Sequence, residues 1–559
     1  MSRVAPAVPG IGAEASPDPR RWLALVVVLA APLMAIFGQF VVNVAIATMQ
    51  RDLRASFGQI QLVIAAYALA YAVLLVTGGR LGDLFGRKRL FLVGLGGFTL
   101  ASALCGLAAD PVLLIAARVA QGAAAALMSP QVLAIIRVTF PPREQSVAFA
   151  LYGATLGLAG ILGQLGGGLL IRANIFGLGW RPIFLINLPV GLAAFVAAVL
   201  LLRESRAPAV RRLDLGGVAI LTAGLFLLVG PLVVGRDTGW PPWSRLCLLA
   251  AAPALAGFVA FERWLAAQGG APLIDLALFR DRAFSLGLVV TLLLMVSNAG
   301  YFLILALYLQ IGLGFSPLTA GLIFTPDAVG FFLAATLSAR LAPKLGSRLL
   351  ILGVGLRIVG LALAILAARG AGAGLRVVDL LPGLFLQGFG SGCVSAPLVG
   401  FILQGIRGRA AGAAAGVLTT VQQVANALGV AVIGLLFFGL LGRGAEGIAA
   451  EGALTLRQEL VGAGAVPAAL DATLDDFRAC ARDRAVARDP IATPPSCDRA
   501  TLRPADAAVG GAITEGLSRA RARGYGDAFV TTLAWIVAGL AGTVLLMLRL
   551  PTTPAVPDD

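Results

Sequence analysis

Two ionisable residues stand inside long apolar segments of the sequence, where an uncompensated charge is unfavourable. Asp327 follows Pro326 near the middle of one segment, and Arg118 lies several residues inside another. Such a residue is a functional-site candidate by default, because hydrocarbon does not solvate its charged form. The Asp327 carboxyl can exchange a proton as its neighbours change, whereas Arg118 keeps its charge and needs a carbonyl or acidic acceptor. We therefore expect proton-coupling chemistry from Asp327 and Arg118; the alternative is that Asp327 is a structural partner of Arg357 or Arg118.

Catalytic and metal chemistry have little support in the sequence. The chain has no histidine, which excludes His-ligated metals and His-based catalytic triads. Its five cysteines lack the spacing of a metal site, and the one long polar segment, residues 443–527, contains no nucleophile with its base. We predict no catalytic residue, no metal and no cofactor, with a proton as the coupling ion. In the polar segment, Cys480 and Cys497 could form a disulfide in an oxidising exterior, and two unpaired thiols are the equal alternative.

Composition identifies lipid as the solvent for most of the chain. Of its 559 residues, 59% are apolar and only 13% are charged, with a mean hydropathy of +0.92. Soluble domains carry about 25% charged residues. The formal net charge of +15 comes from Arg residues scattered between apolar runs, without the continuous basic face that a nucleic-acid partner would need. We expect membrane lipid, and no nucleic acid, as the partner of this surface.

Apolar runs of about 20 residues, the length that crosses a bilayer as a helix, recur along the whole chain. We predict an all-α membrane protein with fourteen spans; short linkers between the fourth and fifth and between the twelfth and thirteenth leave thirteen or fifteen as alternatives. The predicted spans are residues 22–46, 58–78, 90–108, 112–136, 147–171, 184–203, 215–234, 246–266, 284–307, 317–339, 349–368, 378–403, 410–440 and 528–549.

Lys and Arg residues predict the orientation, because short loops that carry them are retained in the cytoplasm. With the N-terminus inside, inner segments hold 22 such residues and short outer loops hold eight. Both termini are thus expected in the cytoplasm, and residues 443–527 outside as a long loop with a polar helix at 468–487. The expected units are a cytoplasmic tail (1–21), a six-helix bundle (22–203), two inserted helices (204–270), a second six-helix bundle that includes the outer loop (271–549), and a cytoplasmic tail (550–559).

An internal repeat links the two predicted bundles. Arg80, Leu81 and Gly86 follow the second span, and the same residue types recur with identical spacing after the tenth span, at Arg340, Leu341 and Gly346. Repeated halves are the usual construction of secondary transporters, with the binding site between them.

The segment GRLGDLFGRKR, residues 79–89, resembles the loop signature between the second and third helices of the major facilitator superfamily. In that family the loop latches the inner gate. Glycines permit a tight turn, and Asp83 can pair with the cations beside it or with a helix N-terminus of the opposite half. A turn with cytoplasmic anchoring charges is the alternative. The gating residues implied by the resemblance are Gly79, Asp83, Gly86, Arg87 and Lys88.

Two further segments resemble signatures of the same superfamily. LIAARVAQGAAAA, residues 114–126, resembles the signature with a buried Arg, here Arg118, with Gln121 three residues on. GILGQLGGG, residues 160–168, is similar to a motif found in its antiporters, although Gln164 stands where the family usually has Pro. Glycine-rich helix packing without a functional direction is the alternative. The motif glycines are Gly160, Gly163, Gly167 and Gly168.

Four segments resemble the fourteen-span drug:proton antiporter group in particular: WRPIFLINLPVG, LDLGGVAILTAG, LYLQIGLGFSPLTAG and TTVQQVANALGVAVIG. The resemblance implies two six-helix bundles plus two inserted helices, in the inner membrane of a bacterium. The chain departs from the group in the first span, where an acidic residue that attracts cations or carries the proton is replaced by Gly38, followed by Gln39. Asp327 is the candidate replacement.

We predict from these features an alternating-access antiporter that exports small amphiphilic or cationic compounds in exchange for protons. A uniporter or symporter for a neutral metabolite on the same fold is the alternative, because the first-span acid is missing; a membrane enzyme is disfavoured. A periplasmic adaptor is an optional partner of the outer loop. Polar residues that could line the substrate cavity, or else join helices, are Gln39, Asn43, Tyr67, Gln121, Asn298, Tyr301, Gln387, Gln422, Gln423 and Asn426.

Overall fold

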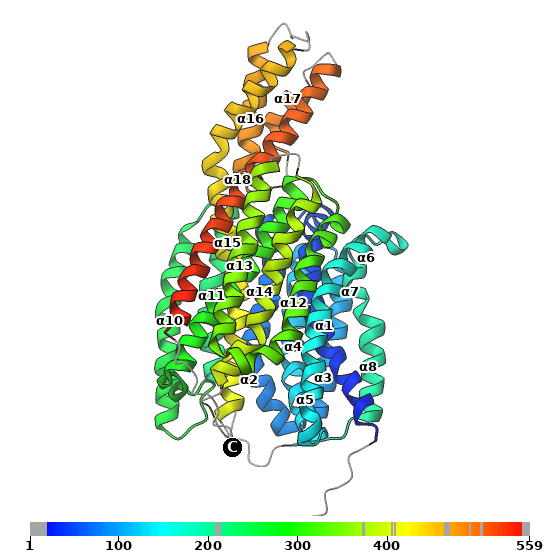
Figure 1. Cartoon of the computed structure of the whole chain (residues 1–559), viewed down its shortest axis with the longest axis vertical. Helices are drawn as coiled ribbons and strands as arrows, with labels where there is room; N and C mark the ends of the chain where they lie inside the picture. Colours follow the sequence, from blue (N-terminus) through cyan, green and yellow to red (C-terminus); the bar gives the residue numbers. More distant parts are fainter. Residues whose placement is uncertain are drawn as a thin grey trace, which may run out of the picture.

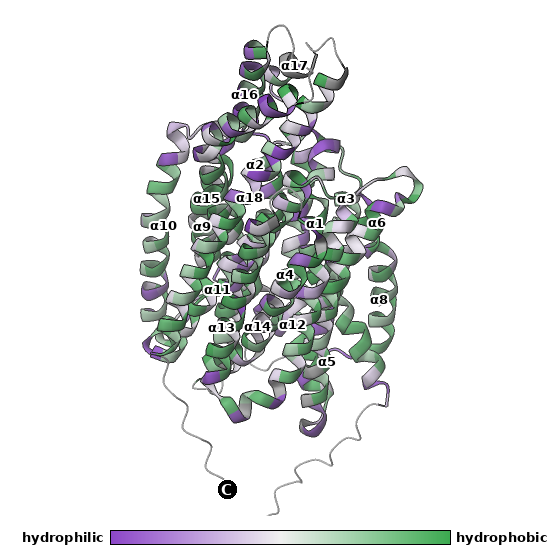
Figure 2. Ribbon diagram, turned by 45° about the horizontal axis from the view of Figure 1, so that its top comes forward, coloured by the Kyte–Doolittle hydropathy of each residue, from purple (hydrophilic) through white to green (hydrophobic). Residues whose placement is uncertain are grey.

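A computed structural model of the chain describes residues 19–206, 214–371, 375–403, 406, 410–462, 470–490, 493–502 and 507–549. All regular structure in these ranges is helical, and fourteen helices are long and apolar enough to cross a membrane. The helices run roughly parallel to the long axis of the molecule (Figure 1). Their residues are mainly apolar over the body and more often polar at the projecting end (Figure 2). The predicted fold class and number of spans are confirmed, while the cytoplasmic tails predicted at 1–21 and 550–559 lie almost wholly outside the described residues.

The first bundle contains spans 1 to 6, and two inserted helices follow it. Span 5 is continuous through a π-helical turn at Leu162–Gly166, and span 6 combines two short helices. The helices are α1 (Arg21–Leu53), α2 (Phe57–Phe85), α3 (Arg87–Gly106), α4 (Pro111–Thr139), α5 (Pro142–Ile161), α6 (Gly167–Ala173), α7 (Pro182–Leu185) and α8 (Asn187–Leu201), with the inserted pair α9 (Leu215–Thr238) and α10 (Pro242–Ala267).

The second bundle contains spans 9 to 14. Its helices are α11 (Arg282–Leu307), which continues through a π-helical turn at Tyr308–Gly312, α12 (Pro317–Leu345), α13 (Ser347–Ala371), α14 (Val377–Leu403), α15 (Ala410–Gly462) and α18 (Ala507–Met547). Two shorter helices, α16 (Leu470–Val486) and α17 (Pro495–Leu502), lie between α15 and α18 in the chain. Helix α15 packs on α2, and α12 packs on α5 and α6, so the two bundles share an extensive interface.

The internal repeat is visible in how α2 and α12 begin and end. Ser56 and Ser316 are the N-caps, and each accepts a hydrogen bond from the backbone N–H three residues on. After 29 residues each helix ends at a glycine with positive φ, Gly86 at 112° and Gly346 at 54°. Glycine adopts such backbone angles without a Cβ clash, which explains why this residue recurs at the same place in both halves.

The described residues of the long connection predicted at 443–527 are mostly helical. The helices α15 and α18 continue beyond the body and, with α16 and α17, form a projection that we call the stalk (Figure 1). The predicted polar helix at 468–487 corresponds to α16. The stalk has its own apolar core, in which Leu456, Phe477 and Ile513 are buried. Mutual burial of these faces stabilises helices that no lipid surrounds.

Cys480 and Cys497 are disulfide-bonded, and the bond joins α16 to α17. Both residues belong to the buried core of the stalk. The other three cysteines, Cys105, Cys247 and Cys393, are free. Of the two alternatives left by the sequence, the structure has the bonded one.

Candidate functional site

A buried polar cluster in the second bundle contains Asp327. Gln387 of α14 donates a hydrogen bond from Nε2 to Oδ1 of Asp327 at 2.9 Å, and its Oε1 accepts one from Nε of Arg357 on α13 at 3.0 Å. The three side chains are buried, with 5% of Asp327, 2% of Arg357 and 1% of Gln387 exposed. The amide of Gln387 thus relays between a cation and a carboxyl, and each of its two ends meets the complementary group.

The Asp327 carboxyl has capacity for one more partner. Among the described residues, its only hydrogen bond is the one from Gln387 to Oδ1, so Oδ2 is available to a proton or a ligand. Tyr301 of α11 is close enough to interact electrostatically with Asp327 and Arg357, and its buried side chain lies beside Gln387. A carboxyl, a guanidinium and a phenol therefore share one water-poor region, where the charge on any of them strongly affects the others.

A second buried cluster lies in the first bundle around Arg118, of which 1% is exposed. Its guanidinium donates to the carbonyl oxygens of Val63 at 2.9 Å and Gly38 at 3.3 Å, and to Oε1 of Gln121 at 2.7 Å. The ring of Tyr67 lies beneath the guanidinium, at 4.2 Å from Cζ to the ring centroid. Carbonyl dipoles and an aromatic face thus hold this cation without a carboxylate.

The predicted coupling pair does not meet. Arg118 contacts side chains and carbonyls of its own bundle, and no hydrogen bond or ion pair among the described residues joins it to Asp327. The partner of Asp327 is Arg357 through Gln387, which was the alternative considered from the sequence. Sequence reasoning assigned no role to Gln387 beyond the cavity, because a relay by a neutral amide leaves no charge pattern.

The loop between α2 and α3 carries the predicted gating residues. Asp83 pairs with Arg87 at 3.0 Å, the first of the two arrangements that the sequence allowed. A Cβ placed on Gly79 would lie 3.6 Å from Cβ of Pro130 on α4. Lys88 donates from Nζ to the carbonyl of Val199 at 2.7 Å. Arg80 of the same signature donates to the carbonyl oxygens of Ala271, at 3.2 Å, and Pro272, so the described contacts of this loop extend beyond its own bundle.

Glu204 is a contact residue of this loop that sequence reasoning missed. Its carboxylate accepts hydrogen bonds from the backbone N–H groups of Lys88 at 3.1 Å and Arg89 at 3.2 Å, at the first turn of α3. An anion at a helix N-terminus satisfies free N–H groups and the helix dipole. The available signal was a lone acid among the arginines that follow the sixth span.

The predicted glycine motif lies at the interface between the two bundles. A Cβ on Gly168 would lie 2.8 Å from Cα of Leu318 on α12, and one on Gly163 would lie 2.9 Å from Cβ of Phe40 on α1. A Cβ on Gly167 would lie 2.6 Å from Cγ2 of Val41 on α1, whereas one on Gly160 would lie 3.9 Å from the ring of Phe40. Three of the four glycines therefore permit a backbone approach that a side chain would block.

The remaining cavity candidates occupy different environments. Tyr67 donates its hydroxyl to the carbonyl of Ala35 at 3.2 Å, so it joins helices within the first bundle. Asn43 accepts, through its carbonyl, a hydrogen bond from Gln310 of the second bundle at 3.1 Å. Gln423 is buried with Oε1 unpaired among the described residues. The remaining candidates are half-buried: Gln39, Asn298, Gln422 and Asn426.

A family model described as Major Facilitator Superfamily matches residues 28–430 of the chain. The chain belongs to the major facilitator superfamily. It is a multi-pass transporter of the bacterial inner membrane, as the fourteen spans and the superfamily membership require, and not an enzyme. Two buried polar clusters, one in each bundle, are thus the candidate site of a transporter with repeated halves.

Curated relatives include proteins named for antibiotics. The chain is 44% identical to the probable actinorhodin transporter of Streptomyces coelicolor, over 97% of this chain and 94% of the relative. It is 38% identical to the puromycin resistance protein pur8 of Streptomyces alboniger, over 75% and 82%. It is 33% identical to the tetracenomycin C resistance and export protein of Streptomyces glaucescens, over 76% and 77%.

A solved structure shares the fold at low sequence identity. A bacterial homologue of the human lysosomal transporter Spinster, in an inward-facing and occupied conformation, is 17% identical and superposes with a TM-score of 0.57, covering 96% of this chain and 98% of that one. At this identity the likeness supports the helical architecture alone.

Proposed function

We propose that this transporter is a proton-coupled antiporter that exports small amphiphilic compounds of the antibiotic or secondary-metabolite class by alternating access. The observation that carries the proposal is the buried Asp327, held by one hydrogen bond from Gln387 and free at its second oxygen among the described residues. The names of relatives that resemble the chain over most of its length support the substrate class.

The coupling follows from the competition for Asp327. When the carboxyl is ionised, the amide of Gln387 and, through it, Arg357 stabilise the negative charge. Protonation removes the charge, which weakens this link between α12, α13 and α14 and leaves Arg357 without its balancing anion. The carboxyl exchanges its proton with whichever side of the membrane it faces. The protonated and ionised forms of Asp327 therefore favour different conformations of the transporter.

Substrate-driven proton release in proteoliposomes tests the proposal. Asp327→Asn keeps the size of the side chain and removes its titration, so we expect proton release below about a tenth of the wild-type rate. Asp475→Asn, which changes an exposed carboxyl of the stalk, is the matched control and should behave as wild type. Unchanged proton release in Asp327→Asn would refute the coupling role.

A second candidate function is facilitated diffusion of a neutral metabolite, which the glycine at position 38 favours, since no carboxylate stands beside Arg118. Collapsing both the pH gradient and the membrane potential separates the two functions. The antiporter stops concentrating its substrate, whereas a uniporter continues to equilibrate it at the same rate.

A further inference from the structure

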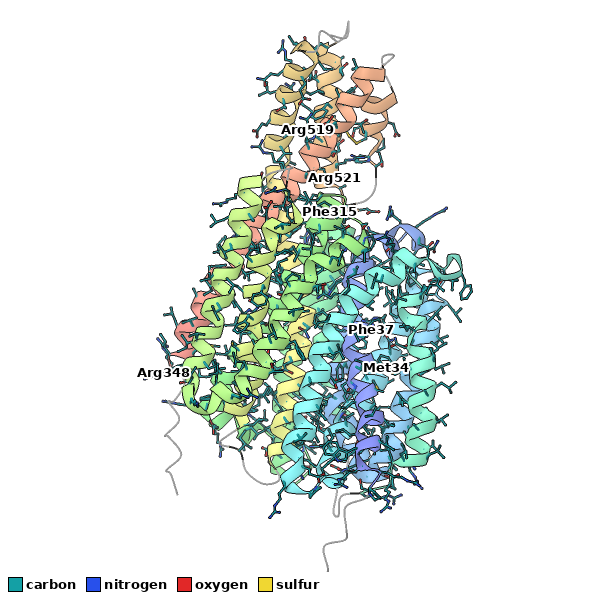
Figure 3. All side chains as sticks on the ribbon, turned by 45° about the vertical axis from the view of Figure 1, so that its right-hand side comes forward. Met34, Phe37, Phe315, Arg348, Arg519 and Arg521 are labelled. Atoms are coloured by element: carbon teal, nitrogen blue, oxygen red, sulfur yellow. A yellow bond between two sulfur atoms is a disulfide. The ribbon has the colours of Figure 1, made fainter. Side chains whose placement is uncertain are left out.

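A cavity of about 510 Å³ lies where the stalk meets the body of the transporter. Its walls come from α1, from the segment that joins α11 to α12, and from the stalk helices α15, α16 and α18. Figure 3 shows Arg521 of the stalk and Phe315 of the body close to each other at this junction. None of the residues of the Asp327 cluster lines this cavity.

The cavity is lined by three cations and no acid. Its charged lining residues are Arg51 of α1, Arg484 of α16 and Arg521 of α18, and none of its described lining residues is Asp or Glu. Burial and the neighbouring Arg521 guanidinium lower the pKa of Arg484, so two like charges share a partly dehydrated space. Such an arrangement is unfavourable unless an anion compensates it.

The nearby acids are engaged elsewhere. Glu459 pairs with Arg519, Glu451 pairs with Arg523 at 2.7 Å, and Asp489 accepts a hydrogen bond from Gln50 at 2.6 Å. In the part of the chain that the structure describes, no ion pair is formed by Arg484 or Arg521. Asp489 adjoins the lining residue Pro490 and is hydrogen-bonded to a neutral amide, so one acid beside the cavity faces three lining cations.

Arg521 also has an unused donor that is buried. Its Nε atom is inaccessible to solvent and has no hydrogen-bond acceptor among the described residues. Its Nη2 reaches the loop before α12, where a Cβ placed on Gly314 would lie 3.9 Å away. A buried guanidinium donor without a partner is costly, and a bound anion is the group that would satisfy it.

The rest of the lining is apolar or aromatic and includes Phe315, Leu441, Leu517 and Tyr525. Aromatic and aliphatic walls with a few convergent charged groups are typical of small-molecule sites, and the volume lies within the range of about 300–1,000 Å³ for such sites. An inorganic anion would leave most of these walls uncovered. The chemistry that fits is an organic anion with an apolar, planar body.

We propose that this cavity binds an amphiphilic organic anion at the outer end of the export path. The role of this cavity in export rests on the proposed function. The anion site adds that acidic amphiphiles are among the exported substrates. The same chemistry is present in an anionic phospholipid of the outer leaflet, and the test separates the two sources.

The test uses fluorescence anisotropy of the full-length protein in nanodiscs of zwitterionic phosphatidylcholine, with fluorescein as an aromatic carboxylate probe. We expect saturable binding that Arg484→Gln with Arg521→Gln weakens at least about tenfold. The matched control is Arg482→Gln with Arg523→Gln, which removes two charges from the same helices, outside the cavity lining, and should change the Kd less than about twofold. Rhodamine 123, which has the same ring system with a positive charge, should not compete.

A second variant keeps the test valid if the double arginine variant fails to fold. Ala485→Phe narrows the cavity without changing its charge and should also weaken fluorescein binding. Absence of saturable binding, or equal weakening by the control pair, would overturn the proposal. If phosphatidylglycerol in the nanodiscs displaces fluorescein, the natural anion is a lipid headgroup; if binding persists, it is a soluble organic acid.

Binding needs no proton gradient, so this result is independent of the coupling test. A protein in which Asp327→Asn leaves proton release unchanged while fluorescein binds loses the proposed function and keeps the anion site. If Asp327→Asn abolishes proton release but fluorescein does not bind, the proposed coupling is retained and the anion site is refuted.

Discussion

Arg118 and Asp327 illustrate two ways to keep an ionisable side chain in a membrane protein. Arg118 donates to two backbone carbonyls and one amide oxygen and lies over an aromatic ring, so its charge is compensated by dipoles. Asp327 is linked to the Arg357 cation by a neutral amide. The first arrangement contains no carboxyl and keeps the charge of its guanidinium, whereas the second changes its charge when Asp327 takes up a proton.

At the residue scale we predict that Arg118→Lys stops transport although the charge is retained. A Lys ammonium cannot present the planar fork that reaches Val63, Gly38 and Gln121 together. The acceptors left unpaired should lower the unfolding free energy by about 1–3 kcal/mol. Thermal unfolding and efflux from whole cells measure the two effects.

Arg137→Lys is the control for this prediction, since Arg137 lies on the same helix α4 and is exposed. Efflux and unfolding temperature should match the wild type there. Wild-type efflux by Arg118→Lys would show that a point charge suffices and that the fork geometry has no role.

Helices are positioned in this protein largely by close backbone approach and by capping groups. Gly168 of α6 lets the chain contact Pro317 and Leu318 at the start of α12, so the two bundles meet there without side chains between them. Glu204 caps α3 and fixes the end of the sixth span against the start of the third. The π-helical turn at Leu162–Gly166 brings the glycine motif into this contact.

At the element scale we predict that Gly168→Ala impairs transport more than its size suggests. The new Cβ would lie 2.8 Å from Cα of Leu318, a backbone atom that cannot move alone, so α6 and α12 must separate. Overpacking of this kind costs about 1–3 kcal/mol and biases the conformation in which the helices touch. Transport by proteoliposomes and cross-linking between α6 and α12 report the change.

Gly153→Ala tests the same substitution in the same span, where no atom lies within 4 Å of the new Cβ. This variant should transport as the wild type does. Equal loss in both variants would assign the effect to glycine content of the span, and not to contact between the bundles.

The whole molecule combines a repeated membrane body with a stalk that the repeat does not contain. The first half connects its last two helices directly, whereas α15 and α18 extend beyond the body and enclose a separate core with α16 and α17 (Figure 1). The stalk contacts the body through Asp489 with Gln50 and through Arg236, which donates to the carbonyl of Ala487 at 2.7 Å. These contacts hold the stalk helices that line the proposed anion cavity against the body helices that line it.

At the scale of the molecule we predict that the disulfide stabilises the stalk and, with it, the cavity. Cys480→Ser with Cys497→Ser removes a cross-link between residues 17 apart, which corresponds to about 3 kcal/mol. The Arg-rich stalk should then be cleaved faster by trypsin, and fluorescein binding should weaken. The same change is expected when the wild type is reduced with dithiothreitol.

Cys247→Ser, which alters a free thiol of α10, is the control and should leave trypsin cleavage unchanged. Cleavage of the double serine variant at the wild-type rate would mean that the apolar core alone holds the stalk, and that the bond contributes little.

Much of the architecture could be predicted from the sequence, because lipid imposes a simple rule on it. A backbone in hydrocarbon must satisfy its own hydrogen bonds, so every long apolar run becomes a helix and its length is set by the bilayer. The fourteen spans, the paired ends of α2 and α12, and the superfamily followed from that rule and from local motifs. This rule did not predict the stalk, because Leu456 and Phe477 are buried in one core although they lie on different helices, and such burial leaves no local pattern in the sequence.

Local sequence thus determined where the membrane helices are, which residues are charged within them, and where glycine must end a helix, because each depends on neighbours within a few positions. Tertiary structure alone decided that Asp327 meets Arg357 through Gln387, that Arg118 is held by carbonyls, and that Arg51, Arg484 and Arg521 surround one cavity. These partners lie on different helices, and their contacts exist only after the helices have packed.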